Sequence, residues 1–231
     1  MGSMILDLSV IAVFALFLLF GFKNGVLKSF LSFAGAIFAA VASNYFSSVG
    51  SKFVYYSFIE PSVIKKISES MASGGLNIDK FRHALPSFVA NSLETCGITP
   101  SSMNHIINNG AAKDIPKQLS ALVAPIFLSV LRAIFAVVIF VCLMIVLKFV
   151  ITFTAKIFKI PFVKSANSLL GGVFGCLKGY IFVAVVLCCI KSVLPSLSKT
   201  PEIFSQNNIA ATSVFKPLYL NNPVYDMFQG M

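Results

Sequence analysis

Four long apolar runs constrain this chain more than any other feature of its sequence. Each is about as long as the roughly 20 residues that an α-helix needs to cross the hydrocarbon core of a bilayer. Only helices and closed barrels satisfy their backbone groups in lipid, and none of the runs alternates as barrel strands do. The sequence therefore predicts an all-α integral membrane protein with about four transmembrane helices, over residues 5–22, 29–49, 129–151 and 169–190.

The composition supports a membrane environment and argues against a nucleic-acid partner. Hydrophobic residues make up 57% of the 231 residues and charged residues only 11%, whereas a soluble domain carries roughly 25% charged residues. A net charge of +10 is compatible with nucleic-acid binding. However, the basic residues are spread singly or in pairs, several of them at the ends of apolar runs, as is typical of charges that flank membrane helices. We therefore expect the lipid bilayer, and no nucleic acid, as a partner.

The apolar runs divide the chain into four regions. Residues 1–50 hold the first two runs and form a transmembrane hairpin, because only a short polar turn with Lys23, Asn24 and Lys28 separates them. Residues 126–194 form a second hairpin. Residues 51–125 are then an extracytoplasmic insertion, and residues 195–231 are an extracytoplasmic tail. The first run is interpreted as a retained span and not as a signal peptide, since no basic side chain precedes it.

The orientation follows from the basic residues in the short loops. Within each hairpin the connection is basic and free of acidic residues. The residues concerned are Lys23 and Lys28 in the first hairpin and Lys148, Lys156, Lys159 and Lys164 in the second. These connections are expected in the cytoplasm, so both termini are expected outside it.

The insertion shows the periodicity of helices. Apolar residues recur on one helical face up to Gly74-Gly75, and a second helical piece, residues 78–93, is bent at Pro86. Thr99-Pro100-Ser101 reads as an N-cap with proline at the first position of a third piece. We expect a small helical cap on the outer membrane face; the alternative is a partly disordered loop. The aromatic-rich tail is expected to fold back onto this cap or onto the membrane interface.

A stripe of small residues opens the fourth run. Gly171, Gly175 and Gly179 recur every four residues, so they form one smooth line on a helix. In lipid, helix association depends on close packing, which such a stripe permits. We interpret the stripe as a helix-packing surface. It packs either within one chain or between chains in a homo-oligomer.

Three charged residues lie within the predicted spans, where charges are costly and mark function or pairing. Asp7 lies near the outer end of the first span and Arg132 near the outer end of the third, so we predict that they form an ion pair. Lys178 lies about ten residues into the fourth span. Its ammonium group either reaches back to the lipid headgroups, or makes a structural hydrogen bond, or lines a polar path between helices.

No pattern in the sequence indicates a catalytic, cofactor or metal site. His83 and His105 are its two histidines, and neither has a further ligand at metal-binding spacing. The five cysteines form no C-x-x-C pair, and four lie in apolar runs, where small packing residues are expected. G-x-S-x-G, H-E-x-x-H and paired carboxylates are all missing. We therefore expect no cofactor, no metal and no enzymatic activity.

The segments that carry these residues resemble the CvpA (colicin V production) family of bacterial inner-membrane proteins. The family has an acidic residue entering the first span, a glycine-containing basic turn after it, and a Leu-Gly-Gly segment opening the last span. The matching segments are Leu6-Asp7-Leu8, Gly21-Phe22-Lys23-Asn24-Gly25 and Leu170-Gly171-Gly172-Val173-Phe174-Gly175-Cys176-Leu177-Lys178-Gly179. The chain departs from the family at Asn167-Ser168, where members often carry an Asp-Arg pair.

The resemblance implies a non-enzymatic inner-membrane protein that supports colicin V-type toxin production or export, or cell-envelope homeostasis, together with export or envelope proteins. An alternative from the residues is a small oligomeric channel or transporter, which the glycine stripe and Lys178 favour. A membrane enzyme is a third reading, which the missing catalytic motifs disfavour.

Overall fold

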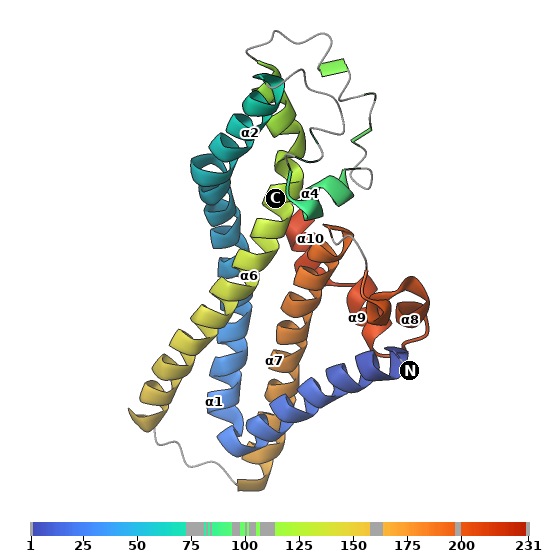
Figure 1. The fold of residues 1–231 in the computed structure, drawn as a ribbon. Coiled ribbons are helices and arrows are strands. Elements are labelled where there is room, and N and C mark those ends of the chain that lie inside the picture. The colour runs from blue at the N-terminus through green and yellow to red at the C-terminus, as the bar shows by residue number, and fades with distance from the viewer. Residues whose placement is uncertain are drawn as a thin grey trace. The chain divides into compact units, whose positions relative to one another are not determined.

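The chain is mostly helical and contains no strand in the part that the computed structural model describes, namely residues 2–72, 81, 83, 85–93, 98–99, 101, 105–106, 114–157, 164–196 and 200–229 (Figure 1). The predicted all-α fold is confirmed. The helices are α1 (Gly2–Val54), the π-helical turn η1 (Tyr55–Ile59), α2 (Glu60–Ala72), α4 (Ser87–Ser92), α6 (Ile115–Ile157), α7 (Lys164–Val193), the 3₁₀ turns η2 (Leu194–Ser196) and η3 (Glu202–Phe204), α8 (Gln206–Ala210), α9 (Phe215–Leu220) and α10 (Pro223–Gln229).

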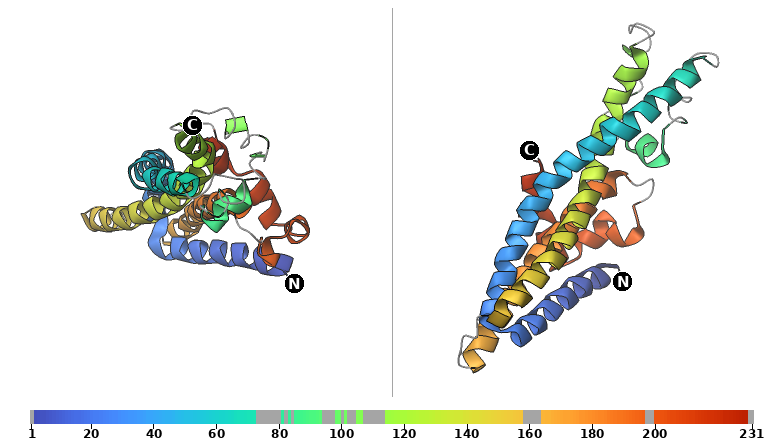
Figure 2. Two further views of the ribbon diagram at one scale, coloured as in Figure 1. Left: turned by 45° about the horizontal axis from the view of Figure 1, so that its top comes forward. Right: turned by 90° about the vertical axis from the view of Figure 1, so that its left-hand side faces the viewer.

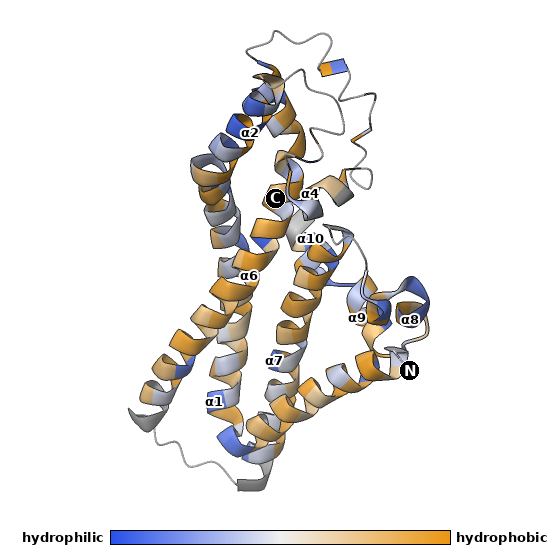
Figure 3. Ribbon diagram, viewed as in Figure 1, coloured by the Kyte–Doolittle hydropathy of each residue, from blue (hydrophilic) through white to orange (hydrophobic). Residues whose placement is uncertain are grey.

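Three helical stretches are long and apolar enough to cross a membrane: Gly2–Ala72, Ile115–Phe153 and Asn167–Val193. In their most apolar windows only 17%, 17% and 39% of the residues are buried inside the protein. In Figure 3 these helices are coloured mostly as hydrophobic. Hydrophilic residues lie at the lower bend of α1 and on α2. Such a continuous exposed apolar surface belongs in lipid, so the protein is an integral membrane protein.

A single residue, Gly25, divides α1 into two limbs. Its φ of 72° and ψ of 174° are non-helical, and this region is essentially restricted to glycine, since any Cβ is strained there. The first limb (residues 2–24) and the second limb (residues 26–54) diverge from this bend (Figures 1 and 2). In place of the polar turn expected between the first two spans, two helices therefore meet at a bend formed by the single residue Gly25.

The chain forms two compact units. The first comprises residues 1–46, 135–191 and 201–231. One of its cores joins Ala39 on the second limb, Phe140 on α6 and Val185 on α7. Another joins the first limb and α7 to the tail, through Leu6, Val10, Val183, Leu187 and Phe215. The tail, expected on the cap or at the membrane interface, thus packs directly on two of the apolar helices.

Two polar contacts hold the end of this tail. The buried Asn222 side chain donates from Nδ2 to the Ala184 carbonyl of α7 at 2.9 Å, and its Oδ1 accepts from the backbone N–H groups of Val224 and Tyr225. The Lys191 ammonium lies 4.1 Å from the centre of the Tyr225 ring, a cation–π contact. The described residues of the tail from Pro201 onward therefore pack as part of the first unit.

The second unit comprises residues 47–134 and 192–200. Its core contains Tyr55, Ile67, Phe81, Val89 and Leu119, each fully or almost fully buried. The Tyr55 hydroxyl lies 3.1 Å from the Ser120 carbonyl oxygen, to which it donates. Described residues of the insertion therefore pack into a core with the first turns of α6.

The helical pieces of the insertion differ from those expected. The first is continuous with α1, because the π-helical turn η1 absorbs Pro61, which lacks an N–H group. Pro86 does not bend a helix: its ψ of 145° is extended, and α4 begins at the next residue. The Gly74-Gly75 break and most of the third piece, after Thr99, lie outside the described residues.

The bend at Gly25 generates a prediction about stability. Gly25→Ala places a Cβ in a glycine-only conformation and should lower the free energy of unfolding by about 1–3 kcal/mol. Thermal unfolding of the purified protein in detergent micelles measures this. Gly35→Ala is the control, because Gly35 is helical and its added Cβ meets only the flexible end of Leu147. Equal behaviour of the two variants would contradict the bend.

Candidate functional site

The glycine stripe of α7 packs against the first limb of α1 in the same chain. A Cβ added to Gly171 would lie 2.5 Å from the Gly21 carbonyl oxygen, and one added to Gly175 would collide with the Phe17 carbonyl oxygen. A Cβ on Gly179 would lie 3.1 Å from Phe17 Cβ. The two helices are thus in backbone contact at Gly171 and Gly175, and Gly179 faces the Phe17 side chain. A homo-oligomer formed through this stripe would have to displace the first limb.

The first residues of α7 hold the bend of α1 together. The break at Gly25 frees backbone groups on both limbs, and these need partners in a lipid environment. Asn167 Oδ1 accepts a hydrogen bond from the Val26 N–H at 2.7 Å, and Ser168 Oγ donates to the Phe22 carbonyl oxygen at 3.1 Å. The two positions at which the chain departs from the CvpA pattern are therefore partners of the bend.

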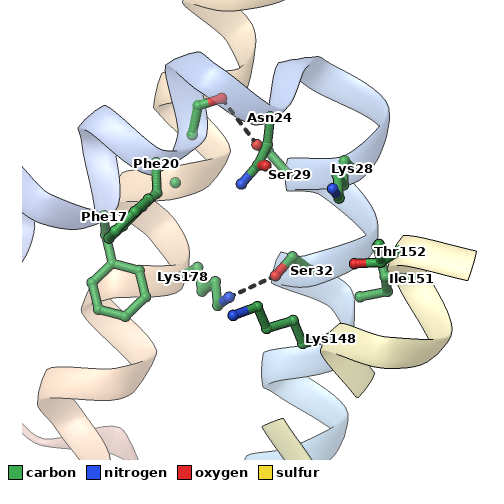
Figure 4. Close-up of a pocket in the computed structure, with 12 residues that line it drawn as sticks. Phe17, Phe20, Asn24, Lys28, Ser29, Ser32, Lys148, Ile151, Thr152 and Lys178 are labelled. Carbon is green, nitrogen blue, oxygen red and sulfur yellow. Dashed lines mark hydrogen bonds between the residues drawn. The ribbon is translucent and has the colours of Figure 1, made fainter. Parts of the chain in front are cut away.

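A cavity of about 240 Å³, lined by both apolar and polar side chains, lies beside this interface, between both limbs of α1, α6 and α7 (Figure 4). Its polar lining residues are basic or neutral, and they come from three helices. They are Asn24, Lys28, Ser29, Ser32, Lys148, Thr152 and Lys178. Among the described residues that line this basic pocket, none is acidic.

Lys178 occupies the centre of the basic pocket. Its Nζ donates a hydrogen bond of 2.6 Å to Ser32 Oγ on the second limb, and it lies 5.6 Å from the centre of the Phe17 ring. In Figure 4 the Lys148 side chain extends from α6 toward the same point. Lys178 therefore makes a hydrogen bond between helices, one of the three roles considered from the sequence, and it also lines the pocket.

Asp7 performs a different task, at the start of the first limb. Its carboxylate accepts three backbone hydrogen bonds from the tail, from Ser213 at 2.9 Å, Val214 at 3.0 Å and Phe215 at 2.8 Å. It thereby caps the start of α9. Arg132 lies on α6 in the second unit, with a half-buried side chain. The ion pair between Asp7 and Arg132 stays a prediction.

The described residues do not suggest metal chemistry. They contain no group of three or more metal-ligating side chains, and His83 and His105 are both exposed. The basic pocket has no acid to act as a general base, so its arrangement suits binding of a negatively charged group.

The comparison with known families gives a match in the second half of the chain. Residues 111–221 match the family model described as Colicin V production protein. This region belongs to the colicin V production protein family. The matched residues include α6, α7, α8 and α9, and thus the segment from Leu170 to Gly179, so the resemblance to the CvpA family is confirmed. No curated protein and no solved structure matches the chain.

The match to the colicin V production family leaves out α1, which carries the other two segments of the resemblance. Sequence reasoning identified Lys178 but not its partners. Ser32 and Lys148 each had a signal, since one is a polar residue within a span and the other a basic residue at a span end. Nothing in the sequence indicated that they meet, because Ser32 and Lys178 are 146 residues apart.

The backbone contact at Gly175 leads to a packing prediction. Gly175→Leu should separate the first limb from α7 and lower the free energy of unfolding by about 1–3 kcal/mol or more, as overpacking does. Val173→Leu is the matched control, because Val173 is 48% exposed on the same helix. Thermal unfolding in detergent micelles compares them, and an unaffected Gly175→Leu protein would rule out the contact.

The carboxylate of Asp7 leads to a second prediction. Asp7→Ala should leave the backbone N–H groups of Ser213, Val214 and Phe215 without their acceptor, so their amide hydrogen exchange should accelerate. Hydrogen–deuterium exchange mass spectrometry reports on that segment directly. Asp226→Ala, which removes an exposed carboxylate of the same tail, should leave the exchange unchanged. Unchanged exchange in Asp7→Ala would show that the cap does not hold the tail.

Proposed function

We propose that the protein is a non-enzymatic inner-membrane protein that supports the production or export of colicin V-type toxins, or cell-envelope homeostasis. The observation that carries the proposal is the match of residues 111–221, which span α6, α7 and most of the tail, to the colicin V production protein family. The exposed apolar helices agree with a membrane location. Export or envelope proteins are the partners that this role requires.

The arrangement of the first unit supports a cytoplasmic location for the bend of α1. The bend, the end of α6 and the start of α7 lie at one end of this unit (Figure 1). Of the six lysines used for the orientation, those on the described helices therefore belong to segments that meet at a single end, and Lys159 lies outside the described residues. Basic residues favour the cytoplasmic side, so the tail, and with it both termini, faces outward in this proposal.

A small oligomeric channel or transporter is the second candidate, and the basic pocket is the observation that favours it. Polar side chains from three helices converge there within one chain. A solute path would need such groups at membrane depth. The cavity of about 240 Å³ is small, however, and the lipid-facing surface around it is apolar.

Cells that lack the protein test the first proposal. In a host that carries a colicin V-type toxin, we expect less toxin activity in the culture supernatant, or greater sensitivity to detergent, than in the parent strain. Expression of the wild-type protein or of the Val173→Leu variant should restore both properties. The Gly175→Leu variant should restore neither property when less of it accumulates in the membrane. A deletion strain with unchanged toxin titre and unchanged detergent sensitivity would refute the proposal.

Flux through liposomes that contain the purified protein separates the two candidates. The first proposal expects no ion or small-solute flux above that of empty liposomes. The second expects flux that Lys178→Met changes and Val173→Leu does not. The inserted protein is verified by its thermal unfolding before flux is measured, so that an absent signal reports on function and not on folding.

A further inference from the structure

We infer that the basic pocket is a binding site for a phosphate-type anion, and that the occupant is the headgroup phosphate of an anionic lipid. The inference concerns a ligand and does not depend on the role in toxin production. It rests on the charge balance of the first unit, on the geometry around Lys178 and on the opening of the pocket toward the apolar surface.

The charge balance leaves the pocket without an internal counter-ion. The sequence contains no Asp or Glu between Asp7 and Glu60, nor between Asp114 and Glu202. The helices that line the pocket therefore carry no carboxylate near it, and Asp7 is engaged by the tail. Charges within membrane helices are stabilised by partners of opposite sign or by strong acceptors. For this pocket, an anion has to come from outside the chain.

The geometry around Lys178 creates the need for that anion. Its ammonium has three N–H groups, and Ser32 Oγ accepts one of them. The Lys148 side chain points to the same place from α6 (Figure 4). Two ammonium groups that converge without an acid repel each other, and a phosphate placed between them would turn repulsion into attraction. The hydroxyl groups of Ser29 and Thr152, on the same wall, are further donors.

The shape of the pocket favours a lipid headgroup over a free anion. The cavity of about 240 Å³ is several times the roughly 30 Å³ that a water molecule occupies in the liquid, so a phosphate group fits in it. Phe20 lines the pocket and is 59% exposed, and Phe149, next to Lys148, is 72% exposed. Acyl chains can lie along these apolar side chains while the phosphate enters.

The position of the pocket agrees with this occupant. It lies beside the bend of α1, at the end of the spans that the basic residues assign to the cytoplasm. Basic pockets between transmembrane helices on the cytoplasmic side bind lipid headgroups, and the cytoplasmic leaflet supplies anionic lipids. Lysine binds phosphate groups as a point charge, which suits a lipid that binds reversibly.

Lipid titration of the purified full-length protein in neutral detergent tests the proposal. Short-chain phosphatidylglycerol, short-chain phosphatidylcholine and inorganic phosphate are the three probes, and native mass spectrometry together with the shift of the unfolding temperature measures binding. We expect phosphatidylglycerol to bind and phosphatidylcholine to bind more weakly. Lys178→Met and Lys148→Met should each weaken phosphatidylglycerol binding about tenfold, as the loss of a charged hydrogen bond does. Lys117→Met, an exposed lysine elsewhere on α6, should not.

The outcomes separate the alternatives. Inorganic phosphate that binds and displaces phosphatidylglycerol would overturn the lipid assignment and leave a site for free phosphate. Equal binding of both lipids, or unchanged phosphatidylglycerol binding in the two pocket variants, would overturn the anion site altogether. Because Lys148 is exposed, its replacement keeps the test decisive even if the Lys178 variant fails to fold.

Discussion

The backbone contact between the first limb of α1 and α7 is the interaction on which the rest of the first unit depends. Lipid does not drive two apolar helices together, so they associate where their backbones can approach. Gly171 and Gly175 on α7 face Phe17 and Gly21 so closely that a methyl group at either α7 position would collide with a carbonyl oxygen. This approach requires the first limb to end next to the start of α7, and the chain reverses there at Gly25.

The bend at Gly25 interrupts the backbone hydrogen bonds of α1, and neighbouring side chains bind two of the freed groups. The broken helix presents a free N–H on Val26, and Asn167 accepts its hydrogen bond. Ser168 binds the carbonyl of Phe22 on the other limb. The neutral amide and hydroxyl suit a site whose surroundings are already basic.

The same contact shapes both ends of the first limb. At the bend, the divergence of the two limbs leaves room for the basic pocket, in which Lys178 reaches Ser32. At the far end, Asp7 caps the start of α9 and Leu6 packs against Phe215 and its neighbours. The first limb therefore borders the pocket at one end and contacts the tail at the other. Any partner that binds the tail is bound to an element that also borders the pocket.

The sequence by itself determined the membrane location, the helical class, the family and the short list of unusual residues. These properties follow from length, hydropathy and local spacing, which do not depend on how the chain folds in space. It also singled out Asp7, Lys178 and the glycine stripe, because charges and small residues are exceptional in an apolar helix.

Only the tertiary structure decided what each of these residues contacts. The Asp7 carboxylate accepts hydrogen bonds from the backbone of residues 213–215, a contact that the sequence did not indicate. The sequence predicted a bend at Pro86 inside a helix, whereas Pro86 is extended and α4 begins at the next residue. The bond from Lys178 to Ser32 joins residues 146 positions apart. Such contacts arise from helix packing, which local patterns do not encode, and for that reason the basic pocket was visible only in three dimensions.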